Sequence, residues 1–265
     1  MREYWVKQDS GPLFSDLLWA RPEMKSAAGK LLIVGGHAQS FAVPAAAYAA
    51  AEQSGVGVAR VLLPASLEKT VSKLFPAAAF APGNPSGGFA KTALAELLAE
   101  SQWADGVLLA GDLGRNSETH AMLENFASKY SGQLTITKDA ADFFCTQPTN
   151  LRERPKTLLV VSSGQLQKLA SNLHWHHAFT SDLGLVQFVE LLHEFTIEYS
   201  NLHILTRHLD QNIVAIAGRV STTPAPADKP IWRVERAAAA ATWWLQNPNK
   251  PFEALTTSLL GKDSV

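Results

Sequence analysis

Short apolar runs alternate along the chain with longer segments whose apolar residues recur at helical spacing. Residues 30–34 form the first apolar run, and Gly35 and Gly36 follow it directly, which predicts a buried parallel strand that opens into a loop. Similar runs predict strands at 58–63, 106–110, 134–137, 156–161 and 202–205. Helical spacing predicts helices at 42–53, 67–74, 90–99, 120–130 and 183–199. Such repeated alternation predicts an α/β fold with a mostly parallel central sheet between two layers of helices.

The two ends of the chain depart from this alternation. Residues 1–29 contain the breakers Gly11-Pro12 and Arg21-Pro22 and predict an irregular N-terminal arm. Towards the C-terminus, residues 213–216 and 219–222 predict a hairpin, and residues 232–245 and 252–260 predict two closing helices. Neither a linker rich in proline and glycine nor an internal repeat divides the sequence. We therefore expect a single domain over residues 1–265, with its core at about 30–260.

Composition narrows the choice of partners and compartment. The formal net charge of −1 offers no positive field that would gather nucleic acid, and no apolar run is long enough to span a membrane. We expect the basic residues Lys129, Lys138 and 152–156 to lie on a solvated surface. Cys145 is the single cysteine, which excludes an intrachain disulfide and fits a reducing compartment. The N-terminus lacks the apolar segment of a signal peptide, so the expected location is the cytoplasm.

Three loops are candidates for a ligand site, because ligands of doubly wound sheets bind where the parallel strands end. One loop contains Gly36, the second is Gly111-Asp112-Leu113-Gly114, and the third is Ser162-Ser163-Gly164. Each follows a predicted strand and precedes a helix, so free backbone N–H groups there favour an anion. Any one of them is also compatible with an ordinary strand-to-helix turn. Together they predict a ligand that carries phosphate.

The order of these motifs resembles the NAD(P)H-hydrate dehydratases of the ribokinase-like superfamily. Residues 29–36, Pro44 and residues 55–58 are similar to that family's Gly-Gly-Ser turn, its Gly-Ala-Pro helix start and its Gly-x-Gly segment. Residues 110–115 resemble the Gly-Pro-Gly-Leu-Gly loop, and residues 137–141 resemble the Asp-Ala-Asp-Ala-Leu segment. Further matches are residues 161–165, at the Thr-Pro-His-x-Gly-Glu motif, and residues 213–221, at the nucleotide-binding hairpin.

The resemblance implies a three-layer α/β/α fold and a lyase that repairs nicotinamide nucleotides. In that family, hydrated NADH or NADPH is dehydrated with ADP or ATP and Mg²⁺ as cofactors, because the ring hydroxyl becomes a phosphate leaving group that is then eliminated. Homo-oligomers are usual there, so a homo-oligomer is expected here. The residues that would line the dinucleotide side are Gly36, Val43, Asp112, Gly114, Asp139 and Ser163. Those on the nucleotide side would be Arg207, His208, Asn212 and Gly218.

Several positions depart from the family pattern. The family places an aspartate general base in a Gly-x-Gly-Asp turn, but residues 219–246 contain no glycine, which leaves Asp228 and Glu235 as the candidate bases. Ser163 stands where the family has histidine, and Asp112 stands where it has glycine and puts a carboxylate where a ligand anion would sit. Loss of a general base alone lowers a rate by roughly 10²–10⁴-fold.

Three hypotheses about function therefore remain open. The first is a divergent dehydratase-like protein that binds a nucleotide or dinucleotide and whose activity is weak or lost. The second is a non-catalytic scaffold or ligand sensor, which the missing glycine turn and Asp112 favour. The third is a small-molecule kinase of the same superfamily, which would also need the aspartate turn.

One histidine-rich segment invites a metal interpretation. Helical spacing would place His174 and His177 on adjacent turns, and Asp182 would add an oxygen ligand. The sequence offers no second half of such a site. A loop or subunit contact is therefore the expectation, and no metal site is predicted.

Overall fold

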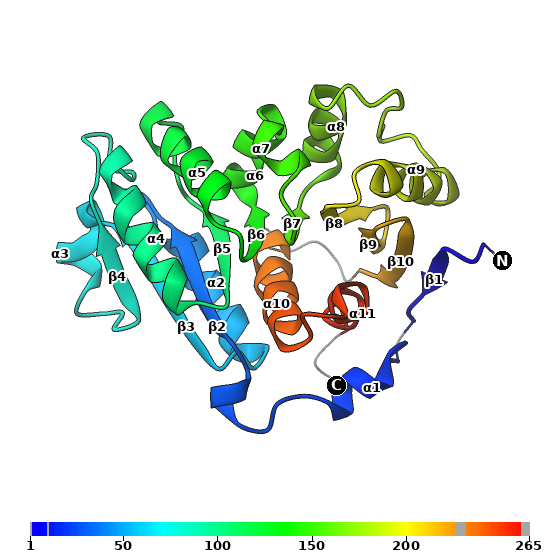
Figure 1. The fold of residues 1–265 in the computed structure, drawn as a ribbon, viewed down its shortest axis with the longest axis horizontal. Coiled ribbons are helices and arrows are strands. Elements are labelled where there is room, and N and C mark those ends of the chain that lie inside the picture. The colour runs from blue at the N-terminus through cyan, green and yellow to red at the C-terminus, as the bar shows by residue number, and fades with distance from the viewer. Residues whose placement is uncertain (1, 10, 226–231, 261–265) are drawn as a thin grey trace.

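The computed structural model describes residues 2–9, 11–225 and 232–260. In this part of the chain, ten strands form one sheet in the order β1-β10-β9-β8-β7-β6-β5-β2-β3-β4 (Figure 1). The strands are β1 (Trp5–Lys7), β2 (Lys30–Gly35), β3 (Val58–Pro64), β4 (Ala78–Ala81), β5 (Gly106–Gly111), β6 (Gln133–Thr137), β7 (Thr157–Val160), β8 (Leu202–His208), β9 (Gln211–Ile216) and β10 (Arg219–Pro224).

Neighbouring strands are parallel except at β9, which runs antiparallel to both β8 and β10. Strands β2, β3, β4, β5 and β7 are short and mostly apolar, because a parallel sheet covered on both faces leaves no polar side, whereas β6 carries Gln133, Thr135 and Thr137. For example, Ile33 at the middle of β2 pairs with Val61 of β3 and Leu108 of β5. We call the edge at which β2, β5, β6, β7 and β8 end the carboxyl edge, and the other one the amino edge.

Two layers of helices cover the sheet (Figure 1). One layer holds α4 (Leu94–Trp103), α5 (Ser117–Lys129), α6 (Lys138–Thr146), α7 (Thr149–Arg152), α8 (Ser163–Asn172) and α9 (Leu185–Glu198). The other holds α2 (Ala42–Gln53), α3 (Glu68–Val71), α10 (Trp232–Gln246) and α11 (Pro251–Thr257), while α1 (Ser15–Trp19) packs beside α11. The expected three-layer α/β fold is thus confirmed.

Alternate strand residues point to opposite faces of the sheet, so the apolar core divides in two. Leu109 and Ile136 pack under the first layer with Phe126, whereas Leu108 and Val160 pack under the second. The alanine run 237–241 of α10 carries little side-chain bulk and faces α2. Small side chains there bring α10 close to both α2 and the sheet.

The apolar pattern located most strands but missed several short elements. Strand β4 is an edge strand of alanine and phenylalanine with half-buried side chains, so its pattern is weak. Helix α6 starts directly after β6 without a linker, which hides its beginning, and the N-terminal arm contains β1 and α1. The helix expected at 67–74 is shorter: α3 covers 68–71, with a 3₁₀ turn at 65–67 before it and a turn at 72–74 after it.

Arg154 contradicts the expectation of a solvated surface at 152–156. Its side chain is buried, with 6% exposure, whereas Arg152 is exposed. The guanidinium donates to the carbonyl oxygens of Ala127, Tyr130, Gly132, Pro155 and Lys156 and to the Thr157 hydroxyl. Arg154 therefore joins the end of α5 to the starts of β6 and β7.

Burial of His203 makes stability depend on pH. His203 lies on β8 against the Trp244 ring, at 4.8 Å between centroids, and burial lowers the pKa of the imidazole to about 4. The unfolded chain takes up the proton near pH 6.5, whereas the folded chain does not, so stability is lost as pH falls from that value towards 4. Between pH 7 and pH 5 this proton uptake costs about 2 kcal/mol of unfolding free energy.

Urea unfolding of the wild type and of His203→Leu at both pH values measures this contribution. The leucine variant is expected to lose about 2 kcal/mol less than the wild type between pH 7 and pH 5. Comparing the two proteins cancels the contributions of other titrating groups such as Asp139. Equal losses in both proteins would show that His203 is protonated in the folded state.

Candidate functional site

The carboxylate of Asp112 lies at the N-terminus of α2. Asp112 follows β5 with a φ of 58°, and its Oδ2 accepts hydrogen bonds from the Ser40 hydroxyl at 2.7 Å and the Val43 N–H at 3.0 Å. Helix α2 starts at Ala42, so Asp112 caps it from another strand. Free N–H groups and the helix dipole favour an anion at this position. The protein's own carboxylate therefore occupies the anion-favouring position at this helix N-terminus.

The glycines of the first two loops allow backbone segments to approach each other. Gly36 has a φ of 95° and donates its N–H to the Gly111 carbonyl at 3.0 Å. Gly114 has a φ of 73°, and a Cβ there would lie 3.0 Å from Cδ2 of His37. The structure thus brings Gly36, Val43, Asp112 and Gly114 together around the ends of β2 and β5.

Asp139 is a second carboxylate bound by loop amides. It lies in the first turn of α6, and its Oδ2 accepts the N–H groups of Leu113 at 2.7 Å and Gly114 at 3.2 Å. Burial raises the pKa of Asp139, and the nearby charge of Asp112 raises it further, while the amide bonds act in the opposite direction. Its Oδ1 is buried and has no hydrogen-bond partner among the described residues. The loop amides after β5 are therefore already occupied by a carboxylate.

The third loop forms a capping box at the start of α8, where Ser163 is the first helical residue. The Ser162 hydroxyl accepts the Gln165 N–H at 3.3 Å, and Oε1 of Gln165 accepts the Ser162 N–H at 3.0 Å. Arg233, from the first turn of α10, donates to the same Oε1 at 2.6 Å. Because Nε2 of Gln165 donates to Asp142 of α6 at 2.7 Å, this contact joins α10, α8 and α6 across the carboxyl edge.

The four residues expected on the nucleotide side do not form one cluster. Arg207 and Asn212 are register partners on β8 and β9 at the carboxyl edge. His208 stacks on Phe188 at 4.1 Å between centroids, and its Nε2 lies 2.7 Å from the Leu183 carbonyl, so its ring is held under α9. Gly218 lies at the amino edge, in the turn between β9 and β10.

Gly218 also has no room for a ligand on its α9 side. Its N–H donates to the Thr196 hydroxyl at 3.1 Å, and its carbonyl contacts Nδ1 of His193. A Cβ on Gly218 would lie 2.7 Å from Cγ1 of Ile197. Packing against α9 therefore accounts for this glycine.

A buried polar cluster beside Asn212 was not predicted. Nε2 of Gln8, from the N-terminal arm, donates to the Thr223 hydroxyl at 3.2 Å and to the Thr256 carbonyl at 2.7 Å. Thr223 is the register partner of Asn212 on β10. The Asn212 side chain is 2% exposed, and its Nδ2 has no acceptor in the part of the chain that the structure describes. These residues come from opposite ends of the sequence, so no local pattern could have indicated the cluster.

Glu235, one of the two candidate bases, lies half-buried in the first turn of α10, where its charge neighbours the Arg236 guanidinium. Asp228 lies outside the described residues.

Over the described ranges, no three His, Cys, Asp or Glu side chains are grouped so that they could hold a metal ion. The structure places His177 3.5 Å from Glu194, and His174 has a φ of 59°, outside a helix. None of the helices in residues 2–9, 11–225 and 232–260 has the length and apolarity to cross a membrane.

Neither a family model nor a curated protein matches this sequence. Solved structures do resemble the fold. A ribokinase-like superfamily protein from Enterococcus faecalis V583 has a TM-score of 0.73 and 16% identity, over 97% of this chain and 86% of that one. The ADP/ATP-dependent NAD(P)H-hydrate dehydratase of Bacillus subtilis, co-crystallised with ATP/Mg²⁺, has a TM-score of 0.56 and 12% identity, over 94% and 86%.

A third similar structure is a kinase. The phosphomethylpyrimidine kinase of Clostridium difficile 630 has a TM-score of 0.52 and 12% identity, and the match covers 87% of this chain and 97% of that one. All three matches have low identity, so they establish architecture and no activity. The three-layer arrangement, the antiparallel β9 and these neighbours agree with the expectation from the sequence motifs: the protein has a ribokinase-like fold.

Proposed function

We propose that this protein is a nucleotide-binding relative of the NAD(P)H-hydrate dehydratases that has lost dehydratase turnover. The observation that carries the proposal is the bond between the Asp112 carboxylate and the first turn of α2. A phosphate of the hydrated dinucleotide would have to displace this carboxylate or be repelled by it. The absence of glycine from residues 219–246 also supports the loss of dehydratase turnover. A tight anion-binding turn needs a backbone conformation with positive φ, which glycine adopts more readily than other residues.

Two of the residues expected on the nucleotide side lie together. Arg207 and Asn212 are register partners at the carboxyl edge, and the amide of Asn212 is buried. A buried donor without an acceptor costs about 1–3 kcal/mol, so a bound ligand or water that supplies one would be favourable. ADP or ATP would bring Mg²⁺ on its phosphates, since magnesium is often held by substrate phosphates rather than by a protein cage. Binding of Mg²⁺ by the nucleotide phosphates agrees with the contacts of Asp112 and Asp139. Both carboxylates already accept hydrogen bonds from N–H or hydroxyl groups of the protein, so they are not needed as metal ligands.

A ligand screen tests the proposal. Melting temperature and calorimetry of the full chain would be measured with ADP, ATP, NADH, NADPH and hydrated NADPH, each with magnesium. A ligand at 100 times its dissociation constant adds roughly 2.7 kcal/mol of stability. We expect stabilisation by ADP or ATP and no turnover of hydrated NADPH. Turnover that disappears in Glu235→Gln would instead establish the dehydratase.

Replacing Asp112 by glycine is expected to open the phosphate position. The φ of 58° suits glycine, and the change frees the Ser40 hydroxyl and the Val43 N–H. Affinity for NADPH should rise by about tenfold or more, since removal of a like charge beside a phosphate is worth at least ~1.4 kcal/mol. Asp112→Asn is the matched control, because it keeps the size and an acceptor oxygen but removes the charge, and an intermediate gain is expected. Unchanged NADPH affinity in both variants would show that Asp112 does not block the site.

A non-catalytic scaffold or ligand sensor is the second candidate, favoured by the same Asp112 contacts. It predicts that no nucleotide in the screen stabilises the wild type at millimolar concentration. A small-molecule kinase remains the third and would require ATP consumption with an added alcohol. Homo-oligomerisation and a cytoplasmic location stay expectations.

A further inference from the structure

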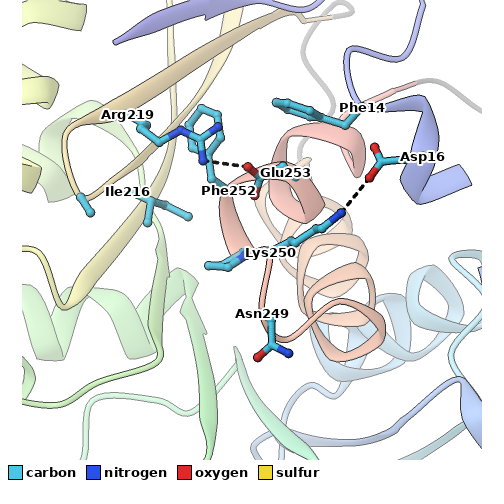
Figure 2. Close-up of a pocket in the computed structure, with 10 residues that line it drawn as sticks. Phe14, Asp16, Ile216, Arg219, Asn249, Lys250, Phe252 and Glu253 are labelled. Carbon is cyan, nitrogen blue, oxygen red and sulfur yellow. Dashed lines mark hydrogen bonds and ion pairs between the residues drawn. The ribbon is translucent and has the colours of Figure 1, made fainter. Parts of the chain in front are cut away.

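A shallow cavity, largely open to solvent, lies at the amino edge of the sheet, on the opposite side from the loops of the candidate site. Its volume is about 480 Å³, within the range of small-molecule sites. Figure 2 shows its walls, which come from three distant segments: the arm at 14–16, the hairpin at 216–219, and residues 249–253, which lead into α11 and form its first turn. The N-terminal arm therefore packs against the rest of the protein and forms one wall of the cavity.

Apolar side chains form much of this cavity. Phe14 and Phe252 meet edge to face, with 6.2 Å between ring centroids, and Ile216 and Pro251 add aliphatic surface. Such a lining suits the ring or the aliphatic body of a small ligand. The charged side chains of the lining then determine which charge the ligand's head group should carry.

Two ion pairs stand in the walls. The Arg219 guanidinium lies 4.0 Å from the Phe252 ring centroid and donates to Glu253 at 2.7 Å (Figure 2). Lys250 donates to Asp16 of α1 at 2.8 Å. The exposed fractions of the side chains are 22% for Glu253 but 63% for Asp16, so the two carboxylates differ in how firmly the fold holds them.

This difference favours an anionic head group. Exposed ion pairs contribute about 0–1 kcal/mol, so Asp16 can leave Lys250 for water at little cost. Arg219 is kept in place by its stacking on Phe252 and its bond to Glu253, and that bond uses one of its five N–H donors. A carboxylate would therefore meet a half-exposed guanidinium that these two contacts orient, and a half-exposed lysine ammonium released from Asp16. A cation would have to compete with Arg219 for the more enclosed Glu253.

We propose that this cavity binds a small carboxylate with an aromatic or aliphatic body. The carboxylate takes the N–H donors of Arg219 that bond to no described residue and the ammonium of Lys250, and the body lies against Phe14, Ile216 and Phe252. The site is separate from the proposed nucleotide site, so its ligand and ADP should bind independently of each other.

Three probes with one body and different head groups test the charge preference. Phenylpropanoate, phenylpropanol and phenylpropylamine would be titrated into the full chain by calorimetry and by amide chemical shifts. Phenylpropanoate is expected to bind saturably and at least about tenfold more tightly than the other two, with shifts at 216–219 and 249–253. Tighter binding of the amine, or binding of none of the probes, would overturn the proposal.

Matched variants then locate the binding. Arg219→Gln and Lys250→Gln should each weaken phenylpropanoate binding by about tenfold or more. Arg60→Gln is the control, because Arg60 stacks 4.0 Å from Trp103 and pairs with Glu100 at 3.2 Å but lines no part of this cavity. Unaltered affinity in both cavity variants, with melting temperatures equal to the wild type, would contradict the assignment, as would equal weakening in Arg60→Gln.

Discussion

Replacing Arg154 by methionine is expected to lower the free energy of unfolding by about 4 kcal/mol or more. Methionine matches the length of the arginine stem but supplies no donor. The change leaves five buried or partly buried carbonyl oxygens and the Thr157 hydroxyl without the guanidinium that now serves them. Each unsatisfied buried acceptor costs about 1–3 kcal/mol, although relaxation and water will recover part of the sum.

The charge of Arg154 persists despite its burial. Desolvation lowers the pKa of the guanidinium to about 10, so it is still protonated at pH 7. Among the described residues no carboxylate pairs with it, and the carbonyl dipoles at the end of α5 and the starts of β6 and β7 stabilise the charge instead. Lysine, a compact point charge, cannot reproduce this fork of donors, so Arg154→Lys is expected to recover only part of the loss.

Arg152→Met is the matched control for this test. Arg152 lies two residues earlier and is exposed, with its guanidinium 5.9 Å from the Tyr199 ring centroid. Urea unfolding is expected to show a change of about 0.5 kcal/mol or less for Arg152→Met. Similar losses in the two variants would mean that Arg154 contributes only as a surface charge does.

The sequence predicted those parts of the fold whose signal is local. The strands β2, β3 and β5 are nearly all apolar and end at glycine or proline, and the turn at Gly218 was located correctly. Strand β1 was missed because its three residues become a strand only by pairing with β10, more than two hundred positions away. The burial of Arg154 was missed for the same reason, since its acceptors are assembled by the ends of α5, β6 and β7.

For the candidate site, the sequence located the loops but only part of their electrostatics. The motifs located the loops at Gly36 and Gly114, and the substitution at Asp112 indicated a carboxylate at the anion position. That this carboxylate binds α2, and that Asp139 binds the following loop, depends on tertiary contacts. From the sequence alone, the three glycine loops are equivalent candidates. A glycine that packing requires cannot be distinguished there from one at a position that would accept alanine.

Gly35→Ala and Gly164→Ala are expected to have opposite effects on stability. A Cβ on Gly35 would lie 2.3 Å from the Gly111 carbonyl oxygen and 2.8 Å from Cγ of Pro44, so β2 and β5 would have to separate. Overpacking of this kind costs about 3 kcal/mol when the neighbours are backbone that cannot turn aside. Gly164 has nothing within 4 Å of its Cβ position and lies in the first turn of α8, so alanine there should add about 0.5–1 kcal/mol.

Urea unfolding of both alanine variants at neutral pH measures this contrast. The same variants separate packing from ligand binding as the reason for each glycine. If Gly35 is required by the close approach of β2 and β5, the loss in Gly35→Ala appears without any ligand and is accompanied by altered amide shifts around Val43, because the Asp112 cap moves with β5. If Gly35→Ala were as stable as the wild type, backbone contact would not explain this glycine, and access for a ligand anion would become the better reason for it. A loss of stability in Gly164→Ala would likewise show that the third loop is constrained by something other than the packing of the described residues.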